Sequence, residues 1–95
     1  MVVGALRVDL ILHDNRSLKG KRKVVKSMVD RVKNRFNVSV AEVGSNDLWQ
    51  RIELGVCTVA NDRRHVDSSL NNVLMFLESL QLAEIVDSAV EIVNF

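Results

Sequence analysis

Residues 6–12 read Leu-Arg-Val-Asp-Leu-Ile-Leu, and this stretch decides the fold because its side chains alternate with a period of two. The leucines and Val8 fall on one face, whereas Arg7 and Asp9 fall on the other. Such alternation is typical of a strand with one buried face and one open face. Residues 13–16, His-Asp-Asn-Arg, are polar and predict a turn after the strand.

A helix is expected after this turn, with Ser17 as its N-cap. Its apolar residues recur at helical spacing and define the face expected to be buried: Leu18, Val25, Val29, Val32 and Phe36. Lysines and arginines occupy the opposite side of the same helix. The pattern therefore predicts a strand followed by an amphipathic, strongly basic helix.

The rest of the chain repeats this alternation of strands and helices. Strands are predicted over 37–43, about 50–60 and 84–95, and the last one is expected to share Val86, Val90 and Ile92 on one face. A second helix, capped by Asn61 or Asp62, carries the apolar stripe Val66, Leu70, Val73, Leu77 and Leu80. The order βαββαβ with right-handed crossovers predicts an α+β, ferredoxin-like fold: a four-stranded antiparallel sheet in the order 4-1-3-2, with two helices on one face.

Composition narrows the class of protein. The chain has no proline and no Gly/Ser linker, so residues 1–95 are expected to form a single domain. No apolar run approaches the ~20 residues of a membrane span, and the N-terminal segment does not resemble a signal peptide. The lone Cys57 excludes an internal disulfide and fits a reducing compartment. We therefore expect a cytoplasmic protein without membrane association.

The net charge of +1 conceals a strong asymmetry. Residues 16–35 contain nine basic side chains and one acid, which is +8, while the other 75 residues contain four basic and eleven acidic side chains, which is −7. Such a division within one domain indicates a polyanionic or acidic partner.

Four segments resemble the YlxP-like family of small bacterial proteins: Ser17-Leu-Lys-Gly-Lys-Arg22, Phe36-Asn-Val-Ser-Val-Ala-Glu-Val43, Asp47-Leu-Trp-Gln50 and Val59-Ala-Asn-Asp62. The resemblance spans essentially the whole chain and implies a ferredoxin-like fold. The family is catalogued as a domain of unknown function, so it implies no catalytic residues. Its genes often neighbour those of translation and ribosome-maturation factors, which implies a possible link to the ribosome. Gly20 departs from the pattern, because many relatives carry an acid or another polar residue there.

The basic helix is the leading candidate site for nucleic acid or another anion. Its proposed ligands are Arg16, Lys19, Lys21, Arg22, Lys23, Lys26 and Lys33. Cations in the first turn oppose the helix dipole, and Gly20 lowers helix propensity. A segment that breaks two local rules is where a functional site is expected. The alternative is an ordinary solvated helix face.

The open face of the sheet is the second candidate. Its apolar members predict an interface with another copy of the chain, through Ile11, Cys57, Val59, Val93 and Phe95. Neither the first nor the third strand contains an aromatic residue, which argues against RNA recognition by stacking on this face. The alternative is a partly apolar face that stays in contact with water.

The remaining reactive side chains indicate no catalytic site. His13, Cys57 and His65 lie on separate elements without metal-ligand spacing, so neither a metal nor another cofactor is expected. Three acids of the sheet's open face, Asp9, Glu53 and Glu91, are expected to pair with the arginines beside them, Arg7 and Arg51. Trp49 either packs over the end of the core or anchors a partner.

Two functions follow from these observations. The leading hypothesis is a small nucleic-acid-binding or ribosome-associated accessory protein that uses its basic helix. The alternative is a homo-oligomeric structural or regulatory module, such as a small-ligand sensor, that associates through its sheet without catalysis.

Overall fold

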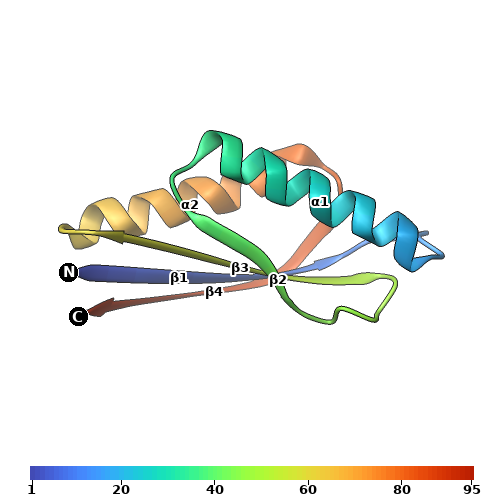
Figure 1. The fold of residues 1–95 in the computed structure, drawn as a ribbon, viewed down its shortest axis with the longest axis horizontal. Coiled ribbons are helices and arrows are strands. Elements are labelled where there is room, and N and C mark those ends of the chain that lie inside the picture. Colours follow the sequence, from blue (N-terminus) through green and yellow to red (C-terminus); the bar gives the residue numbers. More distant parts are fainter.

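A computed structural model describes residues 1–95 as two helices packed on a four-stranded sheet. The elements are β1 (Val2–Ile11), α1 (Leu18–Arg35), β2 (Ser39–Gly44), β3 (Arg51–Ala60), α2 (Arg63–Leu80) and β4 (Glu84–Asn94). The sheet has the order β2-β3-β1-β4, every neighbouring pair is antiparallel, and both helices cover the same face (Figure 1). The predicted ferredoxin-like topology is confirmed.

The core lies between the helices and the inward face of the two central strands. Leu6, Val8 and Leu10 of β1 are buried, opposite Val56, Leu54 and Ile52 of β3, respectively. The period of two sends the intervening residues, among them Arg7, to the uncovered side. The alternation that predicts β1 thus also separates the core from the open face.

Local caps set the ends of both helices. The Ser17 hydroxyl accepts a hydrogen bond from the Gly20 amide at 3.0 Å, as the N-cap prediction requires. Asp62, one of the two predicted caps, does the same for the Arg64 amide at the start of α2. Gln81, in the left-handed conformation at φ 56°, terminates α2. The predicted stripe of α2 is buried as far as Leu77.

The buried stripe of α1 differs from the prediction. Its buried residues are Lys21, Met28 and Val32, and the predicted Val25 and Val29 are only partly buried against the core. The helix is therefore rotated so that the Lys21–Met28 line faces the sheet. Apolar spacing alone misses this rotation, because a charged residue occupies the first position of the line.

Strand β4 is an exposed edge. The register places Val90 opposite Leu6 and Ile92 opposite Gly4, so these two residues share the helix side as predicted. A register shift between Asp9 and Leu10 leaves Val86 without a partner in β1, so its grouping with Val90 and Ile92 stays a prediction. Val90 is still 49% exposed, because little of either helix covers this edge.

No helix is long and apolar enough to cross a membrane. The chain termini lie side by side at one end of the sheet, where the Phe95 amide donates to the Met1 carbonyl at 2.7 Å. The loop between β2 and β3 and the start of α1 lie together at the opposite end (Figure 1).

Burial predicts a sharp contrast in mutational cost. Leu54→Ala, at a position that is 0% exposed, should lower the free energy of unfolding by about 2–5 kcal/mol, because it removes core contacts and leaves a cavity. Met75→Ala, at a 60% exposed position of α2, should change it by less than ~0.5 kcal/mol. Urea unfolding followed by circular dichroism measures both, and equal costs would contradict this placement of the core.

Candidate functional site

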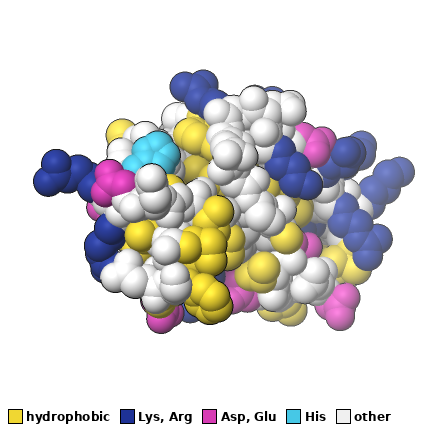
Figure 2. Space-filling model, turned by 60° about the vertical axis from the view of Figure 1, so that its left-hand side comes forward, with side chains coloured by type: hydrophobic (Ala, Val, Ile, Leu, Met, Phe, Trp, Pro, Cys, Tyr) yellow, Lys and Arg dark blue, Asp and Glu magenta, His cyan; other side chains and the backbone are white.

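Six of the seven predicted anion-binding side chains are exposed and form what we call the basic face: Arg16, Lys19, Arg22, Lys23, Lys26 and Lys33. Five of them lie on α1 at successive steps of three, one, three and seven residues, which keeps them on one side of the helix, while Arg16 precedes the N-cap. From Lys19 to Lys33 the helix rises by about 21 Å at ~1.5 Å per residue. Figure 2 shows Lys and Arg side chains projecting from both flanks of the molecule, most densely on the right.

Acidic partners are nearly absent from the basic face. Only Lys26 has a carboxylate within 4.0 Å, that of Asp30 at 3.0 Å one helical turn away. Two other cations of α1 lie outside the face and are engaged locally: Arg31 donates to the Ser27 hydroxyl, and Arg35 lies 4.9 Å from the centre of the Phe76 ring. Five exposed cations therefore remain without an acidic partner.

Lys21, the seventh predicted ligand, is not part of the basic face. Its side chain is 1% exposed, and its ammonium lies 3.0 Å from Glu42 Oε2 of β2. It also donates to the Ser45 carbonyl at the start of the β2–β3 loop. A charge can be buried in this way when it is both paired and hydrogen-bonded. Lys21 lies seven residues before Met28, which is about two helical turns, so both side chains are on the same side of α1. The Lys21 side chain therefore points between α1 and the sheet and cannot reach a ligand in solution.

Gly20 has a packing role. A Cβ at this position would collide with the Asn15 side-chain oxygen and come within 3.1 Å of the Ser17 hydroxyl. A larger residue at this position would therefore require the Asn15 side chain to shift away from the first turn of α1.

Asn15 ties the turn before α1 to the β2–β3 loop. Its side-chain amide donates to the Trp49 carbonyl at 2.6 Å and to the Ser17 carbonyl at 2.8 Å. In return, the Gln50 side chain donates to the Asn15 carbonyl at 3.0 Å. The Trp49 side chain is 52% exposed, so it does not pack over the end of the core.

The open sheet face contains the predicted interface residues. Cys57, Val59, Val93 and Phe95 are exposed, and Ile11 is partly buried. Val59 and Val93 flank Val3 in one cross-strand row. A shallow hollow of about 400 Å³ lies at the centre, where small residues such as Ala5, Gly55 and Ala89 leave space.

The acids on this face are arranged differently from the prediction. Asp9 lies opposite Glu53 on one side and opposite Asp87 on the other, so Asp87 takes the place expected for Glu91. Arg7 contacts Asp9 at 3.6 Å and Asp87 at 3.4 Å, whereas Arg51 makes no ion pair within 4.0 Å. The row is a structural charge network with one arginine at its centre.

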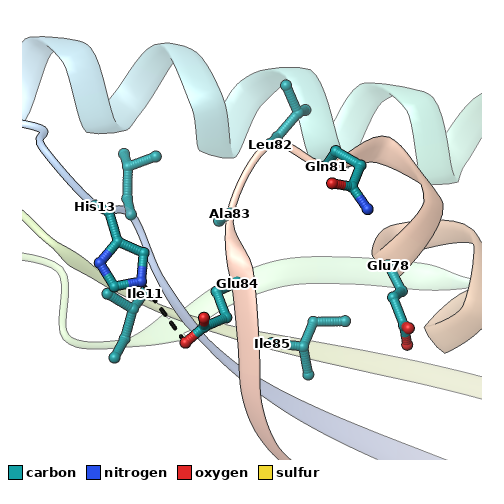
Figure 3. A pocket seen from close by; sticks show the side chains of 9 residues that line it. Ile11, His13, Glu78, Gln81, Leu82, Ala83, Glu84 and Ile85 are labelled. Carbon is teal, nitrogen blue, oxygen red and sulfur yellow. Dashed lines mark ion pairs between the residues drawn. The ribbon is translucent and has the colours of Figure 1, made fainter.

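A larger hollow of about 540 Å³ opens between the ends of β1 and α2 and the start of β4. Figure 3 shows the His13 ring directed at Glu84, with 3.6 Å between His13 Nε2 and Glu84 Oε1, while Glu78 points away from this pair. Both partners are exposed, and no serine, threonine, cysteine or lysine lines the hollow. No group of three or more His, Cys, Asp or Glu side chains is arranged to hold a metal ion.

Comparisons with known proteins agree with the resemblance of the four sequence segments. A family model described as "Protein of unknown function (DUF503)" matches residues 3–90. The chain is 40% identical over 78 residues to "Uncharacterized protein YlxP" of Bacillus subtilis (strain 168), covering 82% of this chain and 85% of that protein.

Among solved structures, the designed protein Foldit4 has a TM-score of 0.53 at 14% identity, with 99% of this chain and 97% of that chain covered. This likeness concerns the fold alone. A REP-associated tyrosine transposase bound to a REP hairpin reaches a TM-score of 0.46 at 9% identity, covering 98% of this chain and 56% of that chain. A likeness this weak supports no argument about function.

The buried ion pair predicts an asymmetric response to substitution. Glu42→Leu should cost about 3–5 kcal/mol of unfolding free energy, because it leaves the Lys21 ammonium buried without a counter-charge. The double variant Lys21→Met/Glu42→Leu should recover most of that loss, since neither charge then remains. Lys19→Met, two residues away and exposed, is the control and should change stability by less than ~0.5 kcal/mol. A near-neutral Glu42→Leu in urea unfolding would contradict the burial of Lys21.

Proposed function

Because the chain belongs to the DUF503 family, whose description states no function, its function must be inferred from its surface, and we propose that it binds nucleic acid through phosphates that lie along the basic face of α1. The observation that carries the proposal is the set of five exposed cations without an acidic partner. Four of them share one side of α1 with a sixth cation, Lys26, and Arg16 lies just before the helix.

Charge elsewhere in the molecule supports this orientation. With residues 16–35 at +8 and the other residues at −7, a polyanion is attracted to α1 and repelled by the acidic strands. Phosphate contacts by lysine and arginine position a protein on nucleic acid without reading sequence. We therefore expect sequence-independent binding to RNA, free or on a ribosomal particle.

The sheet is assigned a different role. Its open face has no aromatic residue on β1 or β3, and one of its rows, Glu53, Asp9 and Asp87, is acidic, so it does not suit a nucleic acid. Its exposed apolar residues, Val59 at 60%, Val93 at 43% and Phe95 at 87%, instead favour a second copy of this chain. A cytoplasmic location is part of the same proposal, because the exposed Cys57 has no disulfide partner.

The size of the open face fits a dimer. Ten residues of β1 at ~3.3 Å each and four strands at ~4.8 Å spacing give roughly 600 Å² for each copy. Two such faces bury about 1,200 Å², the lower end of the range for stable protein interfaces. A small domain with 17 of 95 residues buried gains stability from this association.

Salt dependence tests the nucleic-acid proposal. If five cations each neutralise one phosphate, log affinity for single-stranded RNA should fall with log salt at a slope of about −3.5, from ~0.7 per contact. Lys23→Gln should flatten the slope by about 0.7, because one contact is lost, and leave thermal stability unchanged. Fluorescence anisotropy with a labelled oligonucleotide measures the slope.

Arg64→Gln, which removes an exposed cation from α2, is the matched control and should leave the slope as it is. Undetectable affinity at about 50 mM salt, where phosphate contacts are strongest, or affinity indifferent to Lys23, would reject the proposal.

Sedimentation tests the association. At micromolar concentration the mass should be about twice the 10.7 kDa of the chain, and Val59→Asp should restore the monomer because it buries a charge in the apolar row. Met75→Asp, at an equally exposed apolar position on α2, should remain dimeric. A wild-type mass of one chain would rule out the dimer.

A further inference from the structure

The β2–β3 loop carries an exposed aromatic residue, Trp49, whose backbone is tied to the N-cap of the basic helix. We infer that Trp49 stacks on an unpaired base of a single-stranded nucleic acid whose phosphates lie on the basic face. The inference rests on the proposed function and adds the class of ligand: a single strand with accessible bases rather than an intact duplex.

Trp49 is held next to α1 by a short chain of hydrogen bonds. The Asn15 side chain bridges the Trp49 carbonyl and the carbonyl of Ser17, the N-cap of α1, at 2.6 Å and 2.8 Å. The flanking residues Arg16 and Lys19 belong to the basic face. The backbone at Trp49 and the start of α1 therefore lie together at one end of the molecule (Figure 1).

The loop that carries the ring is fixed at both ends. At its start, buried Lys21 holds the Ser45 carbonyl, which also accepts from the Leu48 amide at 3.0 Å. At its end, the Leu12 amide donates to the Gln50 carbonyl at 2.8 Å. Because the backbone on either side of Trp49 is anchored, a ligand that meets the indole finds it already positioned, which lowers the ordering cost of binding.

The surroundings of the ring suit a base. Trp49 and Leu48 are each 52% exposed, and with Ile11, Gln50 and Arg51 they line a hollow of about 430 Å³. The hollow thus combines apolar walls with one amide and one guanidinium. Every base has a face that can stack on an aromatic ring, and aromatic rings beside cationic grooves are how single strands are bound without sequence preference.

The charges near Trp49 favour an anionic ligand over an apolar protein segment. Arg16 and Lys19 lie close to the N-cap of α1, Arg51 lines the hollow beside Trp49, and none of the three has an acidic partner within 4.0 Å. Two acids are near in sequence, Asp14 and Asp47, and neither makes an ion pair. An intact duplex keeps its bases stacked inside, so only a single strand can offer one to the indole.

Intrinsic fluorescence provides the test, because Trp49 is the only tryptophan of the chain. The probes are a ten-nucleotide oligouridylate, an abasic strand with the same number of phosphates, and an RNA duplex of ten base pairs. Oligouridylate should quench the fluorescence, whereas the abasic strand and the duplex should bind through phosphates with little quenching.

Substitution separates stacking from phosphate binding. Trp49→Ala should weaken oligouridylate binding roughly 5- to 150-fold, which corresponds to one stacked base, and leave the salt slope and the affinity for the abasic strand unchanged. Trp49→Phe should retain most of the affinity, and Met75→Ala, an exposed apolar control on α2, should retain all of it. Circular dichroism in urea verifies that Trp49→Ala is folded.

The outcomes distinguish the two proposals. If all three probes bind with the expected salt slope while the fluorescence and the Trp49→Ala affinity do not change, the stacking inference is overturned and the phosphate proposal stands. If no probe binds at about 50 mM salt, both are rejected, and the exposed ring belongs to a protein contact.

Discussion

Lys21 places a positive charge inside the molecule, between α1 and the sheet, and the end of the domain is organised around it. Its ammonium is neutralised by Glu42 of β2, and the side chain is 1% exposed. Glu42 Oε2 in turn has no hydrogen-bond partner and depends on the ammonium alone. Such a pair adds little net stability compared with apolar residues, yet it fixes which groups meet because either charge alone is costly.

That pairing links three segments that are far apart in the sequence. It sets the rotation of α1, which determines which cations face solvent, and it anchors the start of the β2–β3 loop at Ser45. Asn15 then connects the far end of the same loop to the N-cap of α1. The polar contacts of Lys21 and Asn15 therefore position the basic face and the backbone of Trp49.

Much of the fold could be predicted because periodicity reports which face of an element is buried. In β1 and α2 no charged residue occupies a position of the buried face, so the apolar pattern identifies that face correctly. The strand order and the placement of the helices could be predicted from these patterns. The rotation of α1 could not be predicted, because lysine is usually exposed. Lys21 can be buried only because its ammonium pairs with Glu42, which lies on β2 and not on the same helix. The close approach of the Asn15 side chain to Gly20 could not be predicted for a similar reason, because it is recognisable only in three dimensions. The exposure of Trp49 depends on a loop whose path no sequence pattern specifies.

Strand β4 has a consequence for how the protein behaves in concentrated solution. It is an eleven-residue edge with an unpaired backbone, and it has neither the proline nor the lysine that commonly discourage strand addition. Its protection comes from Glu84, Asp87 and Glu91, with a bulge near Val86. Two such edges that approach each other bring carboxylates together at the spacing of neighbouring strands, about 4.8 Å. This barrier to fibril growth is electrostatic, so the salt that releases a polyanion from α1 also brings the chain closer to aggregation through β4.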